Sequence, residues 1–235
     1  MIPISDINPA RNTPVISRIF MFVTVGVFIL IQPKNQIELF NFFYQYSAIP
    51  CELVKFSPIS EAQFYNNNCF YTQTSSIFPN KNIILSMVFA NFFHANFIHI
   101  LGNLWSFWIF GNNVEDKLGK SKFTIFLIFI GIISIGFHTF LNQESLTPIV
   151  GASGIVSGLM GAYVFMFPNA RLLVLVQCGF LFPTTIKEKF FMICWFISNI
   201  FIALGDQNIS WEAHIGGFIF RYRLLRVFNN KRYNF

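Results

Sequence analysis

Four polar side chains stand inside apolar stretches of this chain, where a hydroxyl, two imidazoles and an amide are unexpected. A hydrogen bond of about 2.6–3.2 Å between Ser153 and His214 would activate the hydroxyl as a nucleophile. His99 and Asn103 are one helical turn apart, so they share one helical face. Side-chain N–H donors of this kind, together with the Ser153 amide, can stabilise the oxyanion of a tetrahedral intermediate. The set therefore predicts acyl-transfer chemistry.

Small residues accompany the serine and the histidine. They are Gly151, Gly154 and Gly158 around Ser153, and Ala213 and Gly217 around His214. Stripes of small residues let two membrane helices approach closely. We expect the helices that carry Ser153 and His214 to pack directly against each other.

The segment around Ser153 is too short to cross a bilayer fully. A helix from Ala152 to Phe167, bounded by Pro148 and Pro168, would be about 24 Å long, whereas the hydrocarbon core is about 30 Å thick. Its N-terminal end would therefore lie below the outer surface, reached by non-helical backbone. Such backbone is tolerated at that depth only where it is buried or lines a wet cavity.

Each polar residue also has a structural explanation when taken alone. A glycine-rich run in a membrane helix is usually a packing device, and a membrane histidine such as His138 commonly makes an interhelical hydrogen bond. Glu115 and Asp116 are expected to cap a helix or form salt bridges. Four tryptophans are expected at the lipid interface or in the core: Trp105, Trp108, Trp195 and Trp211. The functional signal is the conjunction of His94 to Asn103, Ser153 and His214 at one depth.

The composition indicates a membrane protein. Of 235 residues, 54% are hydrophobic and 11% are charged, less than half the charged fraction of an ordinary soluble domain. The net charge of +6 does not indicate nucleic-acid binding, because the basic residues stand between apolar runs instead of forming a patch. We expect one membrane domain over 1–235, with its core at about 83–228.

Six apolar segments predict an all-α bundle of six transmembrane helices. They lie at about 14–32, 88–110, 123–141, 149–167, 189–204 and 211–228. Lys34, Lys55 and Lys81 would lie outside and the other 13 of the 16 basic residues inside, which indicates that both termini are cytoplasmic. The location expected is a bacterial inner (plasma) membrane.

A long outside loop, residues 33–82, follows the first span and is rich in aromatic residues. Part of it is expected to lie in the membrane interface or to pack on the helices. Cys51 and Cys69 share this loop and can pair if it faces an oxidising compartment; the alternative is two free thiols. Cys178 and Cys194 are expected to be free and buried.

Four short motifs, in this order and spacing, resemble the rhomboid family of intramembrane serine proteases. They are HANFIHILGN from His94 to Asn103, FGNNVEDKLG from Phe110 to Gly119, GASG from Gly151 to Gly154, and AHIGG from Ala213 to Gly217. The resemblance covers more than half of the chain.

The resemblance implies a compact six-helix bundle with a water-filled cavity that opens to the outside. It implies that Ser153 is the nucleophile and His214 the general base, with His99 and Asn103 in the oxyanion hole. The implied substrates are transmembrane segments of other proteins, cut near their outer ends within the lipid bilayer. No metal or cofactor is implied.

The chain departs from the family pattern at four places. Ser157 stands where an aromatic residue commonly packs on the histidine, and Arg221 stands where glycine is frequent. Leu85-Ser86 replaces a common Trp-Arg pair, and Asn208-Ile209-Ser210 replaces a glycine-rich approach to the sixth span. Without a stacking ring at Ser157, we expect His214 to be oriented less tightly.

Two other functions compete with proteolysis. A rhomboid-like pseudoprotease would bind transmembrane clients without cleaving them, which the departures at Ser157 and Arg221 favour and the intact Ser153 and His214 oppose. A small transporter would place polar groups on broken helices. The chain shows neither a deep intramembrane carboxylate nor evident repeat symmetry, so transport is the weakest of the three hypotheses.

Overall fold

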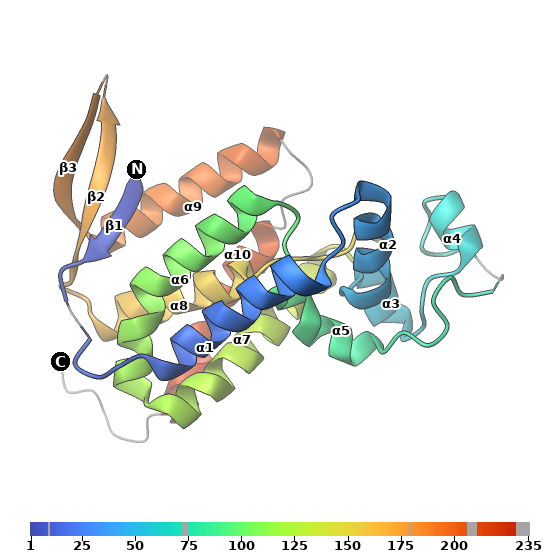
Figure 1. Ribbon diagram of the computed structural model, residues 1–235, viewed down its shortest axis with the longest axis horizontal. Helices are drawn as coiled ribbons and strands as arrows, with labels where there is room; N and C mark the ends of the chain where they lie inside the picture. Colours follow the sequence, from blue (N-terminus) through green and yellow to red (C-terminus); the bar gives the residue numbers. More distant parts are fainter. Residues whose placement is uncertain (9, 72–74, 179, 206–210, 229–235) are drawn as a thin grey trace.

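The computed structural model describes residues 1–8, 10–71, 75–178, 180–205 and 211–228. Within these residues a helical bundle is flanked by a small sheet at one end and by short helices at the other (Figure 1). The bundle helices are α1 (Val15–Gly26, continued by a π-helical turn, Val27–Ile31), α6 (Phe97–Leu118), α7 (Lys120–Leu141), α8 (Ser153–Met166), α9 (Glu188–Gly205) and α10 (Trp211–Phe228). The apolar segments predicted at 123–141, 189–204 and 211–228 coincide with α7, α9 and α10 to within three residues.

The short helix α8 is the centre of the bundle. It packs against α6, α7 and α10, and every residue from Gly154 to Tyr163 is buried. Phe107 and Phe110 of α6, both fully buried, contribute to the same apolar core. The element that carries Ser153 at its first turn is thus held on several sides.

The predicted span at 88–110 is wrong at its start, because the chain bends there. Helix α5 (Ile83–Phe89) and a 3₁₀ turn (Ala90–Phe92) end before α6 begins, and the two parts meet at 84°. The side chain of Asn96 accepts a hydrogen bond from the His99 amide and so caps α6. Because neither Gly nor Pro stands at this point, the prediction carried one helix through the bend.

The N-terminus of α1 is capped by a carboxylate from another helix. Glu115, in the last turn of α6, accepts hydrogen bonds from the amides of Ile16 and Ser17, both at 2.8 Å, and from the Ser17 hydroxyl at 2.7 Å. Asp116 accepts from the amides of Arg11 and Asn12 at 3.0 and 3.2 Å. The capping role is confirmed for Glu115, whereas Asp116 binds the backbone that leads to α1; both contacts fix this segment against α6.

A three-stranded antiparallel sheet, which the sequence did not predict, joins two distant segments. Strand β1 (Ile2–Asp6) pairs with β2 (Arg171–Cys178), and β2 pairs with β3 (Phe180–Lys187), in the order β1-β2-β3. The apolar run in β2 lacks the alternation that marks a half-exposed strand. Leu172 and Val174 are fully buried against the bundle core, which explains its composition.

Strand β1 is fastened to α6. The indole nitrogen of Trp105 donates to the Pro3 carbonyl at 2.6 Å, and the Asn113 amide donates to the Asp6 carboxylate. Burial, the largest effect, raises the pKa of Asp6 to about 6. The sheet is therefore held at the end of the bundle where α6 ends.

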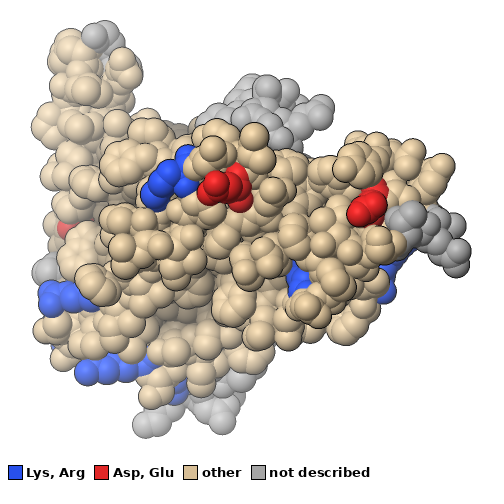
Figure 2. Space-filling view, turned by 45° about the vertical axis from the view of Figure 1, so that its right-hand side comes forward, with Lys and Arg blue, Asp and Glu red and all other residues tan. Residues whose placement is uncertain are grey.

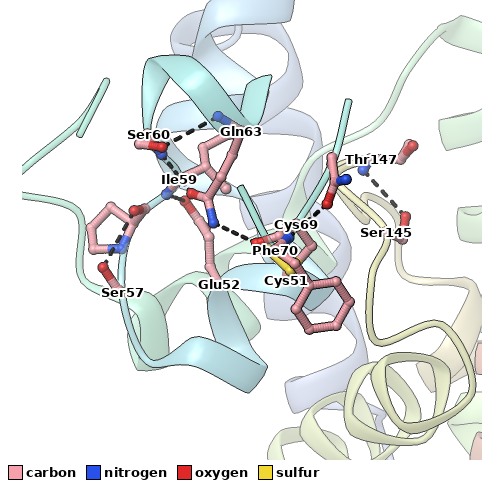
Figure 3. Close-up of a disulfide and its surroundings, with 12 residues drawn as sticks. Cys51, Glu52, Ser57, Ile59, Ser60, Gln63, Cys69, Phe70, Ser145 and Thr147 are labelled. Atoms are coloured by element: carbon pink, nitrogen blue, oxygen red, sulfur yellow. Dashed lines mark hydrogen bonds between the residues drawn. A yellow bond between two sulfur atoms is a disulfide. The ribbon is translucent and has the colours of Figure 1, made fainter. Parts of the chain in front are cut away.

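The predicted outside loop forms short helices and one disulfide. The helices are α2 (Gln36–Tyr46), α3 (Pro50–Lys55) and α4 (Glu61–Tyr65). Cys51 and Cys69 are bonded (Figure 3), which settles the pairing that the sequence left open. Both are buried in a cluster with Ile49, Ile59 and Leu146. The loop thus has an apolar core of its own. Cys194 is free and partly exposed; the Cys178 side chain lies outside the described residues.

A buried ion pair adds to this loop. Glu52 and Lys81 are 2.5 Å apart, and each side chain is 1% exposed. Glu52 also accepts from the Ile59 amide at 3.0 Å, and Lys81 donates to the Tyr44 carbonyl at 2.7 Å. Burial raises the pKa of Glu52, and the Lys81 ammonium opposes that rise.

Length and composition identify few individual spans among the described helices. Helix α7 is long and apolar enough to cross a membrane by itself, and the bent pair of Ile83–Phe92 with α6 is a second if it counts as one span. Val15–Ile31 and α8 are apolar but shorter. The surface in Figure 2 is nonetheless largely free of charged side chains. Large apolar side chains are exposed on the bundle, among them Phe22 and Leu30 at 81% and 83%.

Candidate active site

The segment that leads into α8 is bound by two other parts of the chain. The Ile149 amide donates to the Ala48 carbonyl at 2.8 Å, and the Gly151 amide donates to the Ala90 carbonyl at 2.9 Å. Gly151 has a φ of +116°, which L-residues with a Cβ rarely adopt. This backbone turns directly into α8, whose first residue is Ser153.

Two side chains of α6 lie against that turn. A Cβ added to Gly151 would be 2.6 Å from the Nε2 atom of His99 and 3.5 Å from the Nδ2 atom of Asn103. Asn103 is 7% exposed, and its Nδ2 donor has no hydrogen-bond partner among the described residues. Buried donors are nearly always paired, so this amide is available to an acceptor that enters the site.

His94, predicted as part of the second span, lies at the bend between α5 and α6. It is fully buried, and its backbone exchanges two hydrogen bonds of 2.9 Å with the Gln32 side chain. Its Nε2 atom is 3.5 Å from the Ala152 amide, and its ring is 5.0 Å from that of His99. His94 thus contacts both the backbone that leads to Ser153 and the His99 ring.

Helices α8 and α10 meet through small residues. A Cβ added to Gly154 would be 3.7 Å from the Ala213 carbonyl oxygen, and one added to Gly158 would be 3.4 Å from that of Gly217. A Cβ on Gly217 would overlap the Gly154 carbonyl. The backbones are therefore in contact. Ser153 precedes Gly154 and His214 follows Ala213, so both belong to the same helix crossing.

A ring from α9 lies beside His214, which the sequence did not predict. His214 is 7% exposed, and its ring centroid is 5.5 Å from that of Trp195, with the planes at 37°. Position 157 carries no ring, as the sequence shows, but Trp195 of α9 brings one to His214 from another helix. The sequence shows that Trp195 lies in the fifth apolar segment and His214 in the sixth. It does not show that the two helices pack with these side chains facing each other.

The His138 prediction is confirmed. Its Nδ1 atom is 3.2 Å from the carboxylate of Glu212, which joins α7 to the first turn of α10. This interhelical contact lies two residues before His214 and fixes that end of α10.

The positions at which the chain departs from the family pattern have different surroundings. Ser157 is fully buried one turn after Ser153, and its hydroxyl has no partner among the described residues. On α5, Leu85 is exposed and the Ser86 hydroxyl donates to the Ile83 carbonyl at 2.6 Å. The Arg221 side chain and residues 208–210 lie outside the described residues.

Two further observations concern the surroundings of the site. No three His, Cys, Asp or Glu side chains converge as a metal site in the described part of the chain. An apolar groove of about 850 Å³ opens between α1, α2 and the α5 turn, with Val27, Phe42 and Phe92 in its lining. Ser153 and His214 are not part of that lining, so the groove is separate from the candidate site.

Comparison with known proteins gives one family. The sequence model of the Rhomboid domain matches residues 81–228, well over half of the chain. A putative rhomboid protein of Acanthamoeba polyphaga mimivirus is 30% identical over 149 residues, 61% of this chain and 75% of that protein. A putative rhomboid protease of Bacillus subtilis is 31% identical over 134 residues, 55% of this chain and 61% of that protein.

Other relatives are longer than the region they share with this chain. The mitochondrial rhomboid protein 1 of Saccharomyces cerevisiae is 26% identical over 140 residues, which are 57% of this chain and 38% of that protein. The rhomboid protease GlpG of Yersinia pestis is 30% identical over 128 residues, which are 54% of this chain and 42% of that protein. The chain therefore spans about two fifths of the length of these two relatives.

Proposed function

The chain belongs to the rhomboid family of helical membrane proteins, and we propose that it is a serine endopeptidase that cleaves transmembrane segments of other membrane proteins. Two relatives described above are named proteases, one putative and one of Yersinia. The proposal assigns the nucleophile to Ser153 and the general base to His214. It assigns oxyanion stabilisation to His99, Asn103 and the Ser153 amide.

One observation carries the proposal. The backbone just before Ser153 touches His99 and Asn103 on one side, and the backbone just after it touches the first turn of α10 on the other. The unpaired, buried amide of Asn103 is a donor without an acceptor. Donors held in advance beside a nucleophile are the arrangement that acyl transfer requires.

The first half-reaction forms an acyl-enzyme. His214 takes the proton of the Ser153 hydroxyl as the oxygen attacks the scissile carbonyl carbon, and the carbonyl oxygen becomes an oxyanion. Asn103 and His99 donate hydrogen bonds to that oxyanion. When the C–N bond breaks, the proton on His214 passes to the leaving amine.

The second half-reaction releases the product. Water attacks the acyl carbon, His214 takes a proton from that water, and the same oxyanion donors act again. The returned proton restores the Ser153 hydroxyl as the ester bond breaks. The chemistry needs no metal ion or redox cofactor.

The proposal includes a six-span topology, with α1, the bent pair of α5 and α6, and α7, α8, α9 and α10 as the spans and both termini cytoplasmic. The burial of the short helix α8 from Gly154 to Tyr163 and the predicted excess of basic residues on one side support it. Single cysteines introduced at Ser57 and at Lys122, in a chain without its native free cysteines, would react with an impermeant maleimide from the outside only at position 57. The reverse pattern would contradict the orientation.

The test of catalysis uses a fluorophosphonate probe and a model transmembrane substrate, with the protein in detergent or liposomes. Wild type should be labelled and should cleave. Ser153→Ala and His214→Ala should lose both activities, whereas the control Ser157→Ala, on the same helix one turn away, should keep labelling. Cleavage that persists in Ser153→Ala would contradict the proposed function. Client binding without labelling of wild type would identify a pseudoprotease.

A further inference from the structure

The His214 ring needs a fixed orientation to act on Ser153. A histidine side chain rotates about two bonds, and only part of that range leaves a ring nitrogen within hydrogen-bond distance of a given hydroxyl. The small residues of the crossing between α8 and α10 bring the backbones together but offer no bulky surface to hold a ring. The restraint on the imidazole must include groups from elsewhere.

Helix α9 supplies an aromatic surface at this position. The Trp195 and His214 ring centroids are 5.5 Å apart, with the planes at 37°, which lies in the range of favourable ring pairs. One turn further along α10, the ring centroids of Phe218 and Phe196 are 4.7 Å apart, with the planes at 75°. Adjacent residues of α9 thus contact two residues of α10 that share one face.

Trp195 is itself held in place. Its ring lies 5.0 Å from that of Phe196, nearly perpendicular to it. Phe191 and Met192, one turn earlier on α9, are each 3% exposed and belong to the core cluster that includes Phe110 and Tyr163. The indole is therefore carried by a helix face that is anchored in the bundle.

Helix α8 does not supply such a ring at the position where the family commonly has one. Ser157, one turn after Ser153 on α8, is fully buried. The adjacent residue, Gly158, already approaches Ile130 and the Gly217 carbonyl so closely that a Cβ would meet both. With serine at position 157, the first turns of α8 offer no aromatic ring to His214.

We propose that Trp195 is a positioning residue that holds the His214 imidazole in its working orientation by ring contact across α9 and α10. The inference rests on the proposed function, because it assigns a role to the same site. It also explains how a chain with serine at position 157 can retain an oriented histidine. Trp195 acts through its contact with His214.

The test compares Trp195→Leu, which keeps an apolar side chain but removes the ring, with Trp195→Phe, which keeps a ring. Trp108→Leu is the matched control, since Trp108 is a half-exposed tryptophan on α6. With a model transmembrane substrate in proteoliposomes, kcat of Trp195→Leu should fall about three- to tenfold with KM nearly unchanged. Trp195→Phe should recover at least half of the wild-type kcat, and Trp108→Leu should match wild type.

A second measurement does not depend on activity. The chain has 4 histidines, so NMR of protein labelled at histidine can resolve the Hε1 signal of His214, identified by its loss in His214→Gln. An aromatic ring beside the imidazole displaces the chemical shift of this Hε1 signal. The displacement should be present in wild type and Trp195→Phe and absent in Trp195→Leu, while thermal unfolding in the same detergent changes by no more than in Trp108→Leu.

The outcomes separate the inference from the proposed function. If wild type is labelled and cleaves but Trp195→Leu keeps its kcat, or exceeds it, the inference is wrong and the proposed function stands. An equal loss in Trp195→Phe and Trp195→Leu would also overturn the inference, because the ring would not matter. If wild type neither labels nor cleaves while the NMR displacement follows the ring, the proposed function fails and the ring contact stands.

Discussion

Removing the disulfide between Cys51 and Cys69 should loosen the backbone that leads to Ser153. The bond closes a loop with a sequence separation of 18. The Cys51 amide donates to the Ser145 carbonyl at 3.0 Å, and Ala48 is bridged to Ile149. The disulfide-bonded loop and the approach to α8 are therefore joined by backbone hydrogen bonds.

The magnitude follows from the loop length. Closing a loop of this size in the unfolded chain removes entropy equivalent to about 3 kcal/mol at 25 °C. If the loop between Pro50 and Ile77 opens locally, a change of this size raises its open population roughly a hundredfold. The buried cluster of Ile49, Ile59 and Leu146 remains and limits the effect to local opening.

The assay is native-state hydrogen exchange on the double variant Cys51→Ser/Cys69→Ser in detergent, with pulsed chymotrypsin as a second probe. Exposed Phe56 and Phe70 provide cleavage positions in the loop. Amide exchange at position 51 and at Ile149 should accelerate by roughly the hundredfold factor of the open population. Cleavage of a model transmembrane substrate should slow. Cys194→Ser, which removes the free cysteine of α9, is the control and should change neither.

Two results would refute this reasoning. Unchanged exchange within the disulfide loop would show that the entropy of closure does not control its opening. Faster exchange in the loop with unchanged exchange at Ile149 and unchanged substrate cleavage would show that the loop is not coupled to the approach to Ser153.

Three further predictions concern packing and charge. Gly217→Ala should reduce substrate cleavage at least tenfold, because the added methyl group overlaps the Gly154 carbonyl and separates α8 from α10. Lys81→Met should destabilise the outside loop by about 3–5 kcal/mol in denaturant unfolding, because it leaves the buried Glu52 carboxylate without its partner. Burial raises the pKa of Asp6 from 3.8 to about 6. Between these two pH values the folded chain holds a proton that the unfolded chain has released, so the free energy of unfolding should fall as pH rises through this range. Asp6→Asn should flatten this part of the pH profile.

Matched variants test each explanation. Gly136→Ala on α7, where an added Cβ meets no atom within 4 Å, should retain activity; equal losses at both glycines would contradict the packing argument. The double variant Lys81→Met/Glu52→Gln should recover part of the stability lost in Lys81→Met. If the pH profile of thermal unfolding is the same in wild type and Asp6→Asn, the Asp6 carboxyl is not the cause of the fall in stability with pH.

The helix positions were largely predictable from composition along the chain. The runs at 123–141, 189–204 and 211–228 coincide closely with α7, α9 and α10, because an apolar helix pairs its own backbone groups and needs no distant partner. The start of α8 was equally accessible, since Pro148 and the small residues before Ser153 mark it locally. The bend before α6 was not, because it depends on Gln32 binding the backbone of His94.

Other features depended on which distant segments meet. The sheet pairs Ile2–Asp6 with Arg171–Cys178, and nothing in either segment specifies its partner. Cys51 could have remained unpaired until the fold of the outside loop brought Cys69 to it. Serine at position 157 suggested a loosely held histidine, whereas the packing of α9 brings Trp195 to that ring.

The sequence by itself determined the residue types that could carry the chemistry and the helices on which they stand, since spacing and hydropathy act over one or two helical turns. Only the tertiary structure decided which groups surround them: the His99 and Asn103 contacts with Gly151, the backbone contact of Gly154 with α10, and the ring beside His214. The reason is physical. Contacts between helices depend on the rotation and crossing of whole elements, which no local stretch of sequence encodes.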